Sequence, residues 1–165
     1  MGRTLYSIQA SVIQELYGSN IGDSEALPIA DVAAAIFRTE QQLVHWQTSM
    51  PASMKLVDKR DLFSATGDSL LWKFRVILTL RYHSLRILSH RPVLDRYLQA
   101  MVDPELAVRE ANTLQQIGQL SKTACISSAQ VIIGIVSVCT TLCGSDGAIP
   151  YLGAWWFTLY YSKCP

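Results

Sequence analysis

Residues 68–92 read DSLLWKFRVILTLRYHSLRILSHRP, and this stretch decides the fold. Its apolar side chains recur at three- and four-residue steps, which places five of them on one stripe of a helix: Leu71, Phe74, Leu78, Leu85 and Leu88. Asp68 or Ser69 can cap the start of this helix. Proline lacks a backbone donor and disfavours helical geometry in the residue before it, so we expect the helix to end at Pro92.

Helical patterns also precede this stretch. Residues 4–17 place a set of apolar side chains on one face: Leu5, Ile8, Val12, Ile13 and Leu16. A second helix is predicted to begin near Pro28, which suits a first-turn position, and to run to about Ser49. Residues 50–67 have no sustained period and are expected to form a surface loop.

Helices are predicted downstream as well. We expect short helices at about 92–101 and 104–116, a long apolar helix at about 118–143, and a final aromatic helix that holds Leu152, Trp155, Trp156, Leu159 and Tyr160. Outside these patterns no run alternates with period two over the length of a strand. The predicted fold class is therefore all-α, an irregular multi-helix bundle of about six helices.

Composition narrows the class of protein. The chain has 165 residues, 50% of them hydrophobic, and a formal net charge of +1, which fits one globular domain or part of one. This balance disfavours disorder and a strongly basic nucleic-acid binder. Four cysteines are too few for a disulfide scaffold, and no leader opens the sequence, so we expect a reducing intracellular compartment.

No catalytic or metal-binding motif is found. Cys139 and Cys143 fall one helical turn apart but lack a second close ligand pair, so the cysteines are expected to be free thiols and no metal is predicted. His83 and His90 lie two turns apart on one helix, and neither has a carboxylate three or four residues away. A structural or surface role is favoured for both, and we expect no enzyme and no cofactor in this chain.

Charge gathers in the middle of the chain. Residues 55–96 hold nine basic side chains against four acidic ones: Lys55, Lys59, Arg60, Lys73, Arg75, Arg81, Arg86, Arg91 and Arg96 against Asp58, Asp61, Asp68 and Asp95. Such a region either covers apolar surface with its long side-chain stems or docks an acidic partner or a phosphate backbone. The first interpretation is favoured, because no nucleic-acid-binding motif accompanies the charge.

An uncharged stretch runs from Thr123 to Ser145 and is long enough to span a bilayer. Only Lys122 flanks it, and its interior holds polar side chains, which is atypical of a span: Ser127, Ser128, Gln130, Ser137, Thr140 and Thr141. A buried helix with Ala124, Val131, Ile135, Val138 and Leu142 on its inner face is the favoured interpretation. The alternative is a small helical membrane-associated protein with spans near 123–143 and 149–162.

Residues 80–94, which read LRYHSLRILSHRPVL, resemble the signature helix of the fungal-specific transcription factor domain, the regulatory middle region of zinc binuclear-cluster regulators. His90, Arg91, Pro92 and Leu94 match this pattern, while Ser89 stands where a leucine is usual. Trp46, the Ala124-Cys125 step and residues 153–161 also look like the family. The resemblance covers most of residues 5–161 and marks a set of structural signature residues: Tyr82, His83, Leu88, His90, Arg91, Pro92, Leu94, Trp155 and Trp156.

The resemblance implies a transcription regulator located in the nucleus. Residues 1–165 would be the later part of the family domain and hence an incomplete domain, without the zinc-cluster DNA-binding domain. Zinc and DNA contact would belong to that missing N-terminal region. The implied partners are other proteins or a linked DNA-binding domain, and a small-molecule effector. The aromatic side chains Trp155, Trp156, Phe157 or Tyr82 can be interpreted as the lining of an apolar pocket for such a molecule or as part of the core, and core is the more usual role of aromatic side chains at helical spacing. Membrane association is not expected on this interpretation.

Overall fold

The computed structural model describes residues 4–18, 27–58, 61 and 69–142. Within them lie four α-helices, α1 (Leu5–Tyr17), α2 (Ile29–Thr48), α3 (Ser69–Ala100) and α4 (Pro104–Leu142), and one 3₁₀ turn, η2 (Ala52–Met54). No strand occurs in these ranges, so the all-α prediction is confirmed for this part of the chain. The prediction of about six helices is wrong there. The aromatic helix expected near 149–162 lies outside the described residues.

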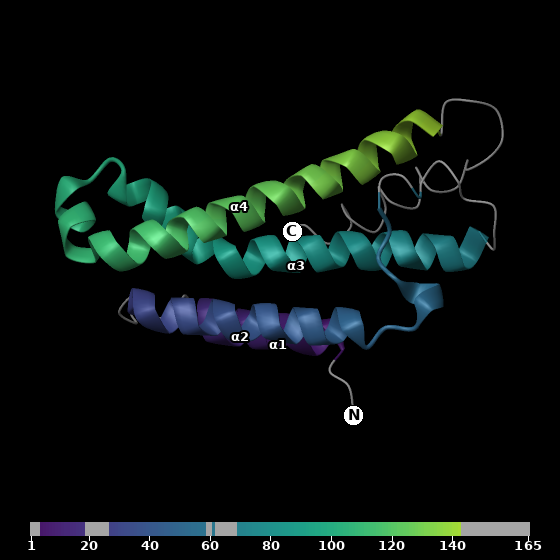
Figure 1. Cartoon of the computed structure of the whole chain (residues 1–165), viewed down its shortest axis with the longest axis horizontal. Coiled ribbons are helices and arrows are strands. Elements are labelled where there is room, and N and C mark those ends of the chain that lie inside the picture. Colours follow the sequence, from purple (N-terminus) through teal and green to yellow (C-terminus); the bar gives the residue numbers. More distant parts are fainter. Residues whose placement is uncertain (1–3, 19–26, 59–60, 62–68, 143–165) are drawn as a thin grey trace.

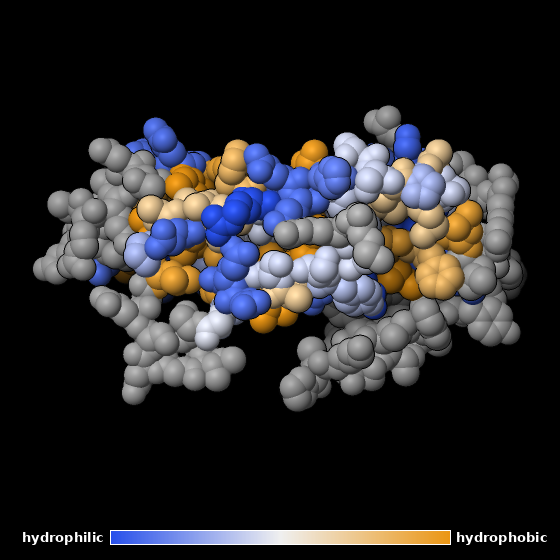
Figure 2. All heavy atoms as spheres, turned by 90° about the horizontal axis from the view of Figure 1, so that it is seen from below, coloured by the Kyte–Doolittle hydropathy of each residue, from blue (hydrophilic) through white to orange (hydrophobic). Residues whose placement is uncertain are grey.

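The helices form two pairs (Figure 1). α1 and α2 lie side by side and cover one side of α3, and α4 runs back along the other side of α3. The α3–α4 contact is by far the most extensive in the bundle, whereas α4 meets α2 over a short length only. On the outer face of α1 and α2, polar side chains gather across the middle with apolar ones between them (Figure 2). α3 is thus the central helix of the bundle.

α1 and α2 begin and end close to where the sequence predicts. Thr4 caps α1 through its hydroxyl oxygen, which accepts a hydrogen bond from the Ser7 N–H at 3.2 Å. Pro28 directly precedes α2, and Ser49 follows its last residue. Four of the five expected inner residues of α1 are buried, while Ile13 is 48% exposed. The reason is that α2 and α3 cover a narrower stripe of the α1 surface than the one that the apolar pattern predicts.

The predicted end of α3 at Pro92 is wrong. α3 continues through Pro92 to Ala100, so the short helix expected at 92–101 is the last part of the same helix. A proline in a helix leaves the carbonyl four residues earlier without its donor, which here is the carbonyl of Leu88. The Tyr17 hydroxyl of α1 donates to that oxygen at 2.8 Å. A tertiary contact that local sequence cannot reveal therefore replaces the missing bond.

The two helices expected at 104–116 and 118–143 are one helix, α4. Gly118 lies within it, although glycine by itself weakens a helix interior. A Cβ at Gly118 would overlap the Tyr97 ring of α3, so the absence of a side chain permits a close approach of the two helices. The Gln119 amide reinforces this contact by donating to the Tyr97 hydroxyl at 2.6 Å.

The apolar core divides into two clusters. The larger joins α1, α2, the second half of α3 and Leu114 of α4, and the smaller joins Val57, the first half of α3 and the end of α4. The predicted stripe of α3 is only partly right. Leu85 is buried and Leu78 and Leu88 are half-buried, but Leu71 and Phe74 are 37% and 48% exposed. Because α3 is covered from two sides, its core positions do not follow one stripe, and Val76, Leu80 and Val93 are buried instead.

α4 has one covered face and one open face. Ala124, Ile135 and Val138 are buried as predicted. In the part of the chain described, one helical segment, Leu114–Val138, is long and apolar enough to cross a membrane, although buried core helices meet the same criterion. Large apolar side chains on the opposite face are exposed: Ile126, Ile133 and Val136. The packing on α3 supports the core-helix interpretation, and the open face leaves a surface to be explained.

Candidate functional site

A polar cluster lies at the point where α2, α3 and α4 meet. The Glu40 Oε1 atom of α2 accepts a hydrogen bond from Arg86 Nε of α3 at 2.8 Å and lies 2.9 Å from His90 Nε2. The other ring nitrogen, His90 Nδ1, lies 3.0 Å from the Ser121 hydroxyl of α4. A neutral ring that donates from Nε2 to the carboxylate can accept the Ser121 proton at Nδ1. One chain of hydrogen bonds thus joins three helices.

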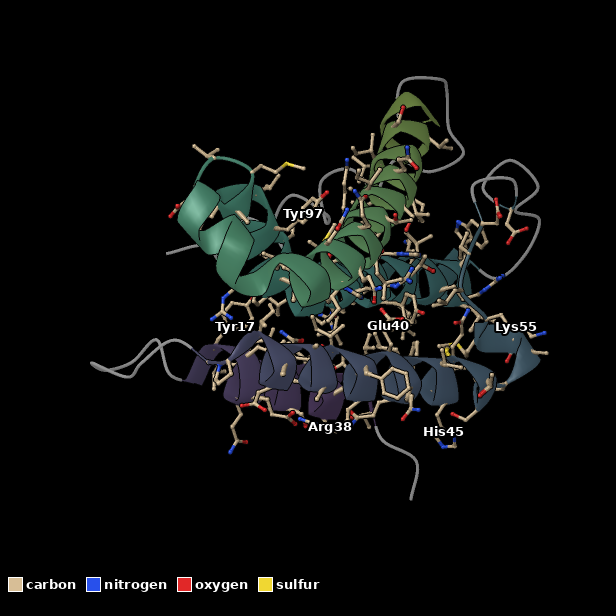
Figure 3. The ribbon with its side chains drawn as sticks, turned by 60° about the vertical axis from the view of Figure 1, so that its left-hand side comes forward. Tyr17, Arg38, Glu40, His45, Lys55 and Tyr97 are labelled. Carbon is tan, nitrogen blue, oxygen red and sulfur yellow. The ribbon has the colours of Figure 1, made fainter. Side chains whose placement is uncertain are left out.

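The helical register explains why these side chains meet. Glu40 stands four residues after Ile36 and three before Leu43, so it shares the inner face of α2 with buried aliphatic side chains. In Figure 3 Glu40 points toward α3 and α4, whereas Arg38 and His45 point away from the bundle. His90 and Ser121 are 1% and 0% exposed. Unpaired polar groups at such depth are costly, so each member of the cluster requires the others.

The electrostatics of the cluster keep the carboxylate ionised. Burial by itself would raise the pKa of Glu40, but the hydrogen bonds from His90 and Arg86, together with the positive charge of Arg86, outweigh burial and hold that pKa below its usual value. The negative charge of Glu40 is therefore matched locally by Arg86.

A groove opens directly over this cluster. Its volume is about 510 Å³, and α2 and α4 form its two walls. The walls are mainly apolar, and Glu40, Arg86 and His90, with the hydroxyl side chains of Thr123 and Ser127, form the polar part of the lining. Two wall residues, Phe37 and Leu120, are 64% and 63% exposed. Large apolar side chains held open beside an enclosed polar group are typical of a binding site.

A serine, a histidine and a glutamate joined by hydrogen bonds resemble a catalytic triad, but the burial of these side chains indicates a structural role. The Ser121 hydroxyl is fully buried in the interior of α4, so no substrate can reach it. No cluster of three metal-ligating side chains occurs among the described residues. Cys125 is a buried free thiol whose pKa is raised by burial, which makes it unreactive. The side chain of Cys139 and residues 143 and 164 lie outside the described part.

The structure places the signature residues of α3 in different environments. Tyr82 stacks on Trp46 of α2 with ring centroids 6.0 Å apart, and burial raises its pKa. His83 meets the Tyr82 ring edge-on at 5.1 Å. Arg91 is exposed and lies 3.8 Å from Asp95, so it does not cap a helix end, because α3 does not end there.

Other signature residues line no common site. The Leu88 carbonyl accepts the hydrogen bond from the Tyr17 hydroxyl, and the Leu94 side chain is half-buried. Trp155, Trp156 and Phe157 lie outside the described residues, and the Tyr82 ring is in the core, so the expected aromatic pocket is not found in the part described. The signature brings only His90 into the groove.

Sequence reasoning missed two members of the cluster. Glu40 and Ser121 lie 50 and 31 positions from His90, and the search for partners covered only neighbouring turns of the same helix. A glutamate in an otherwise apolar helix face was the available signal, since a carboxylate is seldom buried without a partner. It did not indicate which residue that partner would be.

Four of the nine basic side chains of residues 55–96 contact other parts of the fold. Arg75 donates to the Lys55 carbonyl, Arg86 bonds Glu40, and Arg96 donates to the Leu27 carbonyl. Arg81 lies over the Tyr6 ring at 4.9 Å. Lys59 and Arg60 are outside the described residues. The interpretation that these side chains cover and tie the fold is supported, and a nucleic-acid face has no support from them.

Comparisons with known proteins relate the chain to fungal transcription factors. It is 34% identical over 162 residues to Transcription factor FBD3 of Gibberella moniliformis and 32% identical over 163 residues to Transcription factor FBD3 of Fusarium pseudograminearum. Each match covers 95% of this chain and 21% of the relative. Sorbicillinoid biosynthetic cluster transcription factor 2 of Penicillium rubens is 26% identical over 127 residues, 77% of this chain and 17% of that protein.

The chain therefore spans about a fifth of the length of the curated relatives it matches. No protein-family model matches it, and neither does any solved structure. The similarity is to a class of regulator, and it falls on a helical region rather than on a whole protein.

Proposed function

We propose that this chain is part of the regulatory region of a fungal transcription factor and acts in the nucleus without catalysing a reaction. The observation that supports the proposal most strongly is the 34% identity over 95% of the chain to a protein named as a transcription factor. The residues resembling the fungal-specific transcription factor domain lie in α3, the central helix, which supports the same assignment. Zinc binding and DNA contact would then belong to other parts of such a regulator.

The proposed mechanism is control of a linked DNA-binding or activation domain by protein contacts. α2 is tied to α3 by Glu40, Arg86 and His90, and α3 is tied to α4 through Ser121. A buried polar network that is fully paired favours one packing arrangement over others. Displacement of α2 would break this network as a unit, which suits a bundle that switches between two arrangements.

A tethered reporter tests the proposal. The 165-residue chain is placed between a heterologous DNA-binding domain and a constitutive activation domain, and transcription of a matching reporter is measured in fungal cells. We expect the insertion to change reporter output at least threefold relative to a helical insert of equal length and equal protein level. Unchanged output, with the fusion intact and nuclear, would contradict the proposal.

The membrane-associated alternative has one specific observation in its favour, the exposed apolar face of α4. It predicts that the expressed chain stays in the membrane pellet after carbonate extraction. The regulatory proposal predicts release of the chain into the supernatant. The second span of that alternative, near 149–162, lies outside the described residues.

A further inference from the structure

The groove between α2 and α4 has the size of a small-molecule site. Its volume of about 510 Å³ lies in the range of roughly 300–1,000 Å³ that ligand pockets occupy. Ala33, Ile36 and Phe37 line it from α2, and Ile117, Leu120 and Ala124 line it from α4. A docked helix would need a longer trough, whereas α2 and α4 meet over only a short length. The dimensions favour a compact occupant.

The polar part of the groove selects the charge of that occupant. Arg86 and His90 both bond the same carboxylate oxygen of Glu40, Oε1, so neither of them engages Oε2. Glu40 keeps 26% and Arg86 30% of their side-chain surface exposed, so both stay accessible at this end of the groove. Because Glu40 and Arg86 are paired and carry opposite charges, the attraction of either ion to one of them is offset by repulsion from the other, and an ion would still lose its hydration on entering the groove. A neutral hydrogen-bond donor meets neither penalty and can bond the carboxylate.

We propose that this groove binds an uncharged, mainly apolar small molecule that ends in a hydroxyl group, with the hydroxyl directed at Glu40. The apolar body lies between Phe37 and Leu120, whose exposure in the free chain is then relieved. Bound there, the molecule bridges α2 and α4, which have few contacts of their own. The inference stands on the groove alone and does not require the proposed role in transcription.

The test uses three probes with the same eight-carbon tail: octan-1-ol, octanoate and octylammonium. Binding to the full 165-residue chain is measured by calorimetry at neutral pH and moderate salt. We expect octan-1-ol to bind at least tenfold more tightly than either charged probe. Absence of octanol binding would overturn the proposal and would mean that the groove is already filled or does not recognise such molecules. Equal binding of all three probes, or tighter binding of a charged one, would overturn it as well.

Substitutions of two neighbouring alanines of α2 test whether octanol binds in the groove. Ala33 lines the groove, whereas Ala34 is exposed outside it. Ala33→Phe fills the groove and is expected to weaken octanol binding at least tenfold, while Ala34→Phe leaves it unchanged. Equal affinities of the two variants would place the probe elsewhere.

A second readout does not depend on folding of the variants. A photoreactive octanol analogue is crosslinked to the wild-type chain, and the labelled peptides are identified. We expect label on the peptides that hold Phe37 and Leu120. Label confined to other peptides would contradict the proposal. Neither readout involves transcription, so failure here leaves the reporter test unaffected, and the reverse also holds.

Discussion

The Tyr17 hydroxyl donates a hydrogen bond to the Leu88 carbonyl at 2.8 Å, and this carbonyl is the one that Pro92 leaves without a helical donor. The Tyr17 hydroxyl is protonated near neutral pH and can donate, and burial raises its pKa further above that range. One side chain of α1 thereby allows α3 to pass through a proline. The length of the central helix depends on a residue 71 positions away.

Tyr17→Phe removes this donor and is expected to cost about 1 kcal/mol of unfolding free energy, because a half-buried carbonyl is left unpaired. In a Pro92→Ala background the new backbone N–H can bond Leu88, so Tyr17→Phe should cost well under half as much. Urea unfolding of the two single variants and the double variant measures the difference. The same cost of Tyr17→Phe in both backgrounds would show that the hydroxyl does not replace the proline's missing bond.

Two ion pairs with equal N–O distances differ in burial, so substitutions in them measure the effect of burial on stability. Arg86–Glu40 and Arg38–Glu15 both have N–O distances of 2.8 Å, but only the first is half-buried and shared with a buried histidine. Glu40→Gln should cost about 2 kcal/mol, because it weakens two charge-assisted bonds at once. Glu15→Gln, the matched control, should cost less than about 0.5 kcal/mol. Similar losses in chemical denaturation would contradict the structural role assigned to the cluster.

His83 predicts a dependence of stability on pH. Burial, with a smaller contribution from the Arg86 charge, lowers its pKa from 6.5 to about 4. Between these values the unfolded chain binds the proton and the folded chain does not, so stability is complete above pH 6.5 and falls as the pH drops toward 4. Because the ring is only half-buried and solvent screens its charge, the loss from this group should be about 1–2 kcal/mol.

His83→Gln removes the ionisable ring and should flatten that part of the stability curve, measured as unfolding free energy against pH. Glu40 contributes in a lower window, because its pKa lies below 4.5 and its stabilising charge is lost only as the pH falls through that lowered value. A variant curve parallel to wild type between pH 6.5 and 4 would rule out a neutral, buried His83.

Gly118→Ala should destabilise the chain although alanine favours helices. The added Cβ would overlap the Tyr97 ring severely, so relieving it by separating α3 from α4 should cost about 3 kcal/mol, more than the gain of about 1 kcal/mol in helix propensity. Gly18→Ala is the control, because a Cβ there meets nothing within 4 Å and the backbone φ is −63°. Thermal unfolding compares the two. An increase in Tm for Gly118→Ala would contradict the close packing seen at Tyr97.

Much of the fold follows from local pattern, and the exceptions have tertiary causes. The inner face of α1 and the position of α2 follow from apolar spacing and from Thr4 and Pro28. Pro92 indicates a helix boundary by its own chemistry, yet the Tyr17 hydroxyl of α1 supplies the hydrogen bond that the proline removes. At Gly118, between the two helices expected at 104–116 and 118–143, α4 continues and packs closely on Tyr97 of α3. The number of helices was therefore overestimated, because a single helix continues through each of these two positions and packs there against a neighbouring helix.

The candidate site was less predictable than the fold. His90 was singled out from a resemblance, but Glu40 and Ser121 become its partners only when three helices assemble. The expectation that His83 and His90 play structural rather than catalytic roles agrees with their burial and contacts. The aromatic pocket expected from Trp155 and Trp156 falls outside the described residues, and the groove that the structure does contain is built from aliphatic positions on α2 and α4.

We have proposed that this helical bundle, held together by Glu40, regulates transcription. The most direct measurement compares reporter output from tethered wild-type chain, Glu40→Gln and Glu15→Gln at equal nuclear protein levels. We expect Glu15→Gln to change reporter output as the wild-type chain does, and Glu40→Gln to lose most of that change. Equal regulation by all three chains, with Glu40→Gln shown to be destabilised in vitro, would contradict this proposal.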